Sequence, residues 1–139
     1  MRNIELARDY VRRAAVRVRA LDVLYDGGSW PDVVREAQET VELALKGLLR
    51  GYGVSPPRVH DVSDVILAEQ ERLPPSLGPH VPRMVTVSRR LRRDRELAFY
   101  GAEDLTPSGF YSEEDAEAAR ADARWLVEVI SPYAKDWAG

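Results

Sequence analysis

Apolar residues recur at intervals of three or four along most of this chain, the spacing that one buried face of an α-helix requires. In residues 4–24 the stripe includes Val11 and Leu21, and it ends before Gly27 and Gly28. No long run alternates apolar and polar residues, and no Asn-Gly or Asp-Gly pair joins two β-rich segments. The chain is therefore expected to be all-α.

A second long helix is expected to begin at Ser29 and to end near Gly51. Ser29 and Asp32 have the spacing of a capping box, and Pro31 suits the first turn of a helix. Gly51 and Gly53 provide the stop. The apolar face of this helix is the best defined in the chain: Val34, Ala37, Val41, Ala44, Leu45, Leu48 and Leu49.

A short helix after Asp61, a long helix from Pro82 and a last helix from Ser112 complete the pattern. Ser112 and Asp115 again have capping-box spacing, and Pro132 is expected to end or kink the last helix. Long amphipathic helices bury their apolar faces against one another. We therefore predict an antiparallel up-and-down helical bundle of four long helices plus a short helix.

A length of 139 residues suits a single domain over residues 1–139, and we expect residues 133–139 to form a loose tail. The sequence has no cysteine, which excludes disulfides, thiolate metal sites and thiol nucleophiles. His60 and His80 are too few for a multi-histidine metal site, so we expect no cofactor. The sequence opens without a signal-peptide pattern, and no stretch approaches the ~18 apolar residues of a membrane span. We expect a cytoplasmic protein that does not associate with membranes.

Charge is unevenly distributed along the chain, although the net charge is only −3. Lysine supplies only two of the 20 basic residues, and arginine supplies the rest. Residues 83–95 contain six arginines and one aspartate, whereas residues 103–128 contain eight acidic residues and two arginines. Three interpretations are open for an arginine stripe in the first segment: a solvated helix face, a surface for RNA or another polyanion, or a partner for the acidic segment in a dimer. The stripe consists of Arg89, Arg90, Arg92 and Arg93.

Residues 37–49, AQETVELALKGLL, resemble the second helix of HEPN domains (higher eukaryotes and prokaryotes nucleotide-binding). In that helix alanine and glutamine precede a glutamate, and a lysine follows four residues later. The resemblance covers residues 4–131 and is closest to the stand-alone prokaryotic type. Its further motifs are Ala7 and Tyr10 in the first helix, the turn Gly27-Gly28-Ser29-Trp30, the sequence His60-Asp61-Val62, RELAFYG from Arg95 to Gly101, and the helix from Ser112.

The resemblance implies an all-α bundle that is often a homodimer and that acts with a minimal nucleotidyltransferase in a toxin–antitoxin-like module. Catalytic members of the family are metal-independent RNases with an arginine, four to six residues, and then a histidine. In this sequence Tyr100 stands where that histidine would follow Arg95. Histidine exchanges protons near neutral pH, whereas an ordinary tyrosine does not. We therefore expect a nucleotide- or RNA-associated binding subunit rather than an enzyme.

The resemblance assigns the ligand site to Arg95, which would bind phosphate, and to Tyr100, which would stack on or hydrogen-bond to a base. Alternatively, Arg95 pairs with Glu42 or another acid inside the bundle, and Tyr100 packs at a helix end. Two other functions stay open: an RNase toxin that uses Arg95 and Tyr100, with His60 brought in across space or from a second subunit, and a purely structural dimerisation protein. The further residues expected to bind the ligand beside Arg95 and Tyr100 are Arg89, Arg92, Arg93, His60 and Asp61.

Two charged pairs have both a structural and a functional interpretation. Asp61 is a candidate cap for the short helix, with His60 as its entry residue; alternatively, Asp61 orients the imidazole of His60 at a ligand cleft. Glu42 and Lys46 have the spacing of an ion pair on one helix face, placed either at the surface or at a dimer seam. We assign them to the interface.

Overall fold

The computed structural model describes residues 3–100 and 106–137, with the backbone alone for residues 93–100 and 107. Its described residues contain no strand. The four long helices are α1 (Ile4–Asp26), α2 (Trp30–Gly51), α4 (Val81–Tyr100) and α6 (Glu113–Ala134). The shorter elements are α3 (Ser63–Ala68), α5 (Pro107–Phe110) and two 3₁₀ helices, Gln70–Arg72 and Pro75–His80.

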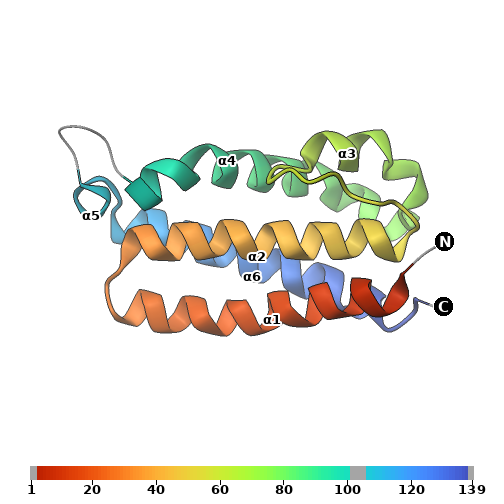
Figure 1. The fold of residues 1–139 in the computed structure, drawn as a ribbon, viewed down its shortest axis with the longest axis horizontal. Coiled ribbons are helices and arrows are strands. Elements are labelled where there is room, and N and C mark those ends of the chain that lie inside the picture. The colour runs from red at the N-terminus through yellow and green to blue at the C-terminus, as the bar shows by residue number, and fades with distance from the viewer. Residues whose placement is uncertain (1–2, 101–105, 138–139) are drawn as a thin grey trace.

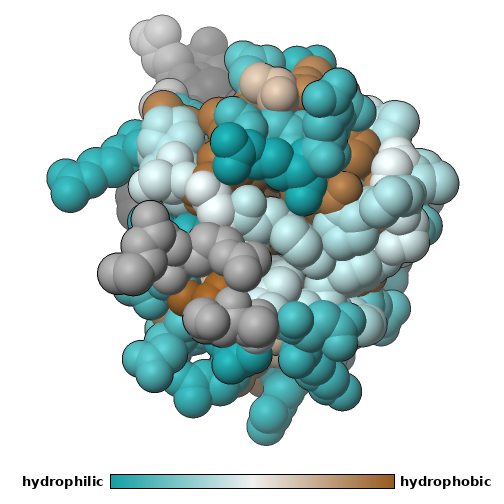
Figure 2. Space-filling model, turned by 90° about the vertical axis from the view of Figure 1, so that its right-hand side faces the viewer, coloured by the Kyte–Doolittle hydropathy of each residue, from teal (hydrophilic) through white to brown (hydrophobic). Residues whose placement is uncertain are grey.

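The long helices alternate in direction along one axis, with α6 behind α1 and α2, and α3 lying over one end of α4 (Figure 1). This arrangement confirms the predicted antiparallel up-and-down bundle. Both termini lie at the same end of the bundle (Figure 1). At this end the surface is mainly hydrophilic, and apolar residues show only in patches between polar ones (Figure 2).

Helix α2 lies at the centre of the bundle, with contacts to α1, α4 and α6. Its apolar face is buried as predicted, and Leu45, Leu48 and Leu49 are completely inaccessible to solvent. Helix α1 approaches α2 closely at Gly47, where an added Cβ atom would lie only 2.9 Å from Cγ2 of Val11. Complete burial of one leucine side chain contributes about 1.5–3 kcal/mol, so burial of this face stabilises the fold by several kcal/mol.

One of the two predicted capping boxes is present. At α6, the Ser112 hydroxyl accepts from the backbone N–H of Asp115, and the Asp115 carboxylate accepts from the N–H of Ser112. At α2, the hydroxyl of Ser29 instead donates to the Asp32 carboxylate at 2.5 Å and makes no cap bond to the backbone. The capping box predicted at Ser29 is therefore wrong, because its two side chains satisfy each other.

The prediction of a loose tail over residues 133–139 is also wrong for residues 133–137, which the structure describes. Helix α6 continues through Pro132 to Ala134, and Trp137 beyond it is only 3% exposed. The indole packs edge-on against Tyr52, with ring centroids 5.9 Å apart. Arg8 of α1 donates to the backbone carbonyls of Ala134 and Trp137. These contacts hold the C-terminal segment against α1 and α2; residues 138–139 lie outside the described part.

None of the helices in the described part of the chain is both long and apolar enough to span a bilayer.

Candidate functional site

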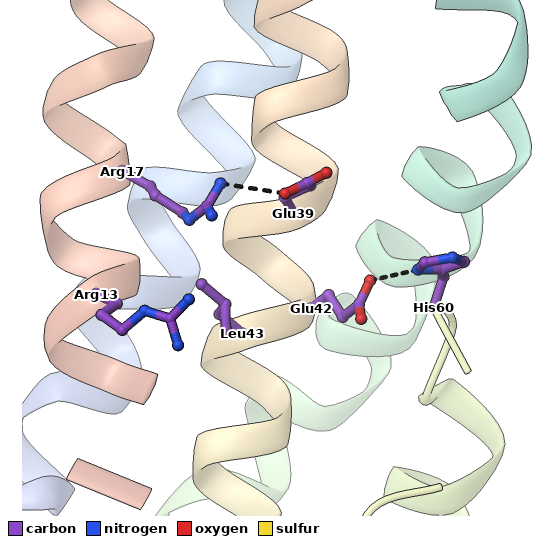
Figure 3. A pocket seen from close by; sticks show the side chains of 6 residues that line it. All are labelled: Arg13, Arg17, Glu39, Glu42, Leu43 and His60. Atoms are coloured by element: carbon purple, nitrogen blue, oxygen red, sulfur yellow. Dashed lines mark hydrogen bonds and ion pairs between the residues drawn. The ribbon is translucent and has the colours of Figure 1, made fainter. Parts of the chain in front are cut away.

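The carboxylate of Glu42 lies at the centre of a polar cluster on the outer side of α2. Its Oε1 atom accepts from Nε2 of Gln38 at 3.1 Å and lies 2.8 Å from Nδ1 of His60. Its Oε2 atom accepts from Nζ of Lys46 at 2.9 Å. Gln38, Glu42 and Lys46 are spaced by four residues and therefore lie along one side of the helix. His60 reaches the same carboxylate from the loop between α2 and α3 (Figure 3).

These hydrogen bonds keep Glu42 ionised. Burial raises the pKa of its carboxyl group, but the bonds from Lys46, His60 and Gln38 outweigh burial and hold the pKa below its usual value. The carboxylate is thus a fixed acceptor that orients the imidazole ring of His60. The expected Glu42–Lys46 ion pair is present, with both side chains less than one-fifth exposed.

Asp61 joins the α2–α3 loop to α4. Its Oδ1 atom accepts from the backbone N–H of Ser63 at 2.9 Å and from the hydroxyl of Ser88 at 2.7 Å. Burial raises the pKa of Asp61, whereas the bonds from Ser63 and Ser88 and the charge of Arg89 lower it overall. Asp61 therefore stabilises the first turn of α3, although Val62 occupies the N-cap position. The idea that Asp61 orients His60 is wrong, because Glu42 does so.

Three arginines of α4, Arg83, Arg89 and Arg90, form ion pairs within this chain. Arg89 donates to Ser63 at 3.1 Å and to Asp64 at 3.0 Å, which places it beside the loop of His60. Arg90 pairs with Asp122 of α6. The acidic segment thus meets part of the arginine stripe inside one chain. Arg92 is half-buried one turn after Ser88.

The remaining predicted residues of α4 lie outside the described side chains. They are Arg93, Arg95 and Tyr100, whose backbone belongs to α4. Their roles stay predictions.

A surface cavity of about 200 Å³ lies over α2 between α1 and the α2–α3 loop. It is lined by Arg13, Arg17, Glu39, Glu42, Leu43 and His60 (Figure 3). Arg17 binds Glu36 at 2.8 Å and Glu39 at 3.2 Å, so its guanidinium is held in place. Arg13 is far less constrained: its side chain is 49% exposed, and the one described carboxylate within ion-pair distance, Asp9, is 3.9 Å away.

Arg13 and Arg17 were not predicted as site residues from the sequence. Both lie just outside the apolar stripe of α1, where periodicity predicts only solvent. Their four-residue spacing, together with acidic residues at Glu36 and Glu39 on the next helix, was a signal that could have indicated the contact.

The cavity presents the guanidinium of Arg13 and the imidazole of His60, and both types of side chain can bind anions. His60 is bound at Nδ1, and among the described side chains none hydrogen-bonds Nε2. Arginine and protonated histidine donate to phosphate oxygens by charge-assisted hydrogen bonds. No group of three or more metal-ligating side chains occurs among the described residues.

Three comparisons place the chain among known proteins. The family model for the HEPN domain matches residues 7–133. The protein named "Putative toxin MJ1304" of Methanocaldococcus jannaschii is 28% identical over 140 residues, covering 96% of this chain and 91% of that protein. The crystal structure of ST0689, an archaeal HEPN homologue, superposes with a TM-score of 0.67 and 21% identity, covering 96% of this chain and 99% of that one, which shows a shared fold. The match over residues 7–133 and the four-helix architecture together show that this chain belongs to the HEPN family.

Proposed function

We propose that this protein is a nucleotide- or RNA-associated binding subunit that acts as a homodimer with a minimal nucleotidyltransferase in a toxin–antitoxin-like module. Membership of the HEPN family and similarity to a protein named as a toxin support the module.

The observation that carries the binding role is the convergence of three elements around His60. Glu42 of α2 fixes the imidazole of His60. Asp61, the residue after His60, accepts a hydrogen bond from Ser88 of α4. Arg89 of α4 binds Ser63 and Asp64, which follow His60 closely in the chain, and Arg92 lies further along α4. We infer that His60 and these arginines bind the same ligand. Together they offer several donors to one phosphate-bearing ligand. We propose that Arg95 and Tyr100, further along α4, complete it by binding phosphate and base.

The test is a titration of labelled single-stranded RNA and of a nucleoside monophosphate at fixed salt, with the wild type, His60→Ala and His80→Ala. His80 is the matched control, because it contacts Trp125 instead, with ring centroids 5.9 Å apart. We expect His60→Ala to weaken binding at least about tenfold, which corresponds to about 1.4 kcal/mol, and His80→Ala to leave it unchanged. A purified protein that binds no RNA, no nucleotide and no nucleotidyltransferase would refute the proposal.

A second candidate function is metal-independent RNA cleavage. It is favoured by the contact between Nδ1 of His60 and Glu42, because a carboxylate that orients an imidazole leaves the other nitrogen to exchange a proton with a ribose hydroxyl. Cleavage in the presence of a chelator, abolished by both His60→Ala and Arg95→Ala, would establish this activity. RNA that is bound but stays intact with the folded wild type would exclude it in favour of the binding role.

A further inference from the structure

The cavity over α2 continues past His60 to the arginines of α1. On one side Glu42 extends from α2 towards His60, and on the other Arg13 extends from α1 towards Leu43 (Figure 3). Leu43 lies between them and is half-buried. The cavity therefore has a cationic group on the α1 side, an apolar floor in the middle and an imidazole on the loop side.

The charges in this region leave Arg13 available to an external anion. Glu36 and Glu39 bind Arg17, and Arg35 lies 3.7 Å from Glu39. Glu42 is neutralised by Lys46. The Asp9 carboxylate that approaches Arg13 pairs more closely with Arg12. The acidic side chains near the cavity are thus matched by other cations.

We propose that the ligand is a single-stranded RNA that crosses α2 from His60 to Arg13, with Arg13 as a second phosphate contact. This inference rests on the proposed function and adds Arg13 to its ligand site. A single phosphate at His60 would need no donor on the far side of Leu43. A strand carries a phosphate on every nucleotide, so one phosphate can lie at His60 while a later one meets Arg13. The exposed surface of Leu43 would contact the intervening ribose.

The size of the cavity agrees with part of a strand rather than a whole folded RNA. The cavity, of about 200 Å³, has room for one sugar and its phosphate. Bases would remain outside the cavity, because its walls are charged and only Leu43 is apolar. Binding should therefore depend on strand length and on salt more than on base identity.

The experiment compares Arg13→Gln with Arg19→Gln. Arg19 is another arginine of α1, its side chain is exposed, and it does not line the cavity. Arg12 is unsuitable as the control, because its removal would free Asp9 to pair with Arg13. Each variant is titrated with a labelled RNA decamer and with a mononucleotide, over a range of salt concentrations. Both substituted side chains are largely exposed, and circular dichroism confirms the fold of each variant.

We expect Arg13→Gln to weaken decamer binding about three- to tenfold and to reduce the slope of log affinity against log salt by about 0.7, the value for one lost phosphate contact on a single strand. Mononucleotide binding should be unchanged, because one nucleotide reaches only the His60 side. Arg19→Gln should leave the affinity for both ligands and the slope unchanged.

Decamer binding that responds equally to Arg13→Gln and Arg19→Gln would overturn the inference while leaving the proposed function intact. Loss of mononucleotide binding in Arg13→Gln would also overturn it, because it would place a single nucleotide at Arg13. A wild type that binds neither probe would instead refute the proposed function itself.

Discussion

The contact between Gly51 and Trp137 makes a sharp prediction about stability. Gly51 is the last residue of α2, and a Cβ atom added there would lie 2.6 Å from Cδ2 of the Trp137 ring and closer still to two other ring atoms. The ring has little room to retreat, because it is 3% exposed and packs against Tyr52. Gly51→Ala must therefore displace the indole.

The magnitude follows from two opposing effects. Alanine is favoured over glycine in a helix by up to about 1 kcal/mol. Overpacking costs about 1–3 kcal/mol, and complete loss of a buried tryptophan sets an upper limit of about 3–5 kcal/mol. We expect Gly51→Ala to lower the free energy of unfolding by about 2 kcal/mol. In a Trp137→Ala background the obstacle is gone, so the same substitution should be neutral or should raise stability by up to about 1 kcal/mol.

Urea unfolding of the four proteins of this double-mutant cycle, followed by far-UV circular dichroism, measures both effects. The expected coupling energy between the two sites is about 2–3 kcal/mol. Equal destabilisation by Gly51→Ala with and without the indole would show that Trp137 does not pack on Gly51.

Two further predictions concern the caps and the central carboxylate. Ser112→Ala should cost about 1 kcal/mol of stability because it removes a capping box, whereas Ser29→Ala should cost clearly less because its hydroxyl caps no backbone group; equal losses in thermal unfolding would contradict this. Because the pKa of Glu42 is lowered by folding, its ionised form stabilises the protein above the usual glutamate pKa, and that contribution disappears as the pH falls through the lower folded value. The stability difference between the wild type and Glu42→Gln, measured by urea unfolding, should therefore shrink in acid, and a difference that stays constant down to about pH 3 would refute the assignment.

The helices could be predicted because their cause is local. The stripe of α1 and the apolar face of α2 lie within single segments, and burial of these residues follows directly from their spacing. The cap of α6 is equally local, since Ser112 and Asp115 are three residues apart. The same spacing gave a wrong prediction at Ser29, because the side chains of Ser29 and Asp32 bind each other instead of the backbone.

The site residues that were missed depend on contacts between elements. Arg13 lies outside the apolar stripe, but the neighbouring helix turns that position into the wall of a cavity. Glu42 was assigned to a surface or interface ion pair, and nothing in the proline-containing loop reveals that His60 returns to it. Trp137 was assigned to a tail because its partners, Gly51 and Tyr52, lie far away in the sequence.

The most direct test of the account is an NMR titration of the isotopically labelled protein with single-stranded RNA, which reports binding residue by residue. We predict that the amide signals of Glu42, His60, Ser63 and Arg89 shift together and saturate at one RNA concentration, while those around Trp125 on α6 do not move. Shifts confined to the outer face of α6, or no shifts at RNA concentrations that saturate other single-strand-binding proteins, would contradict the central claim.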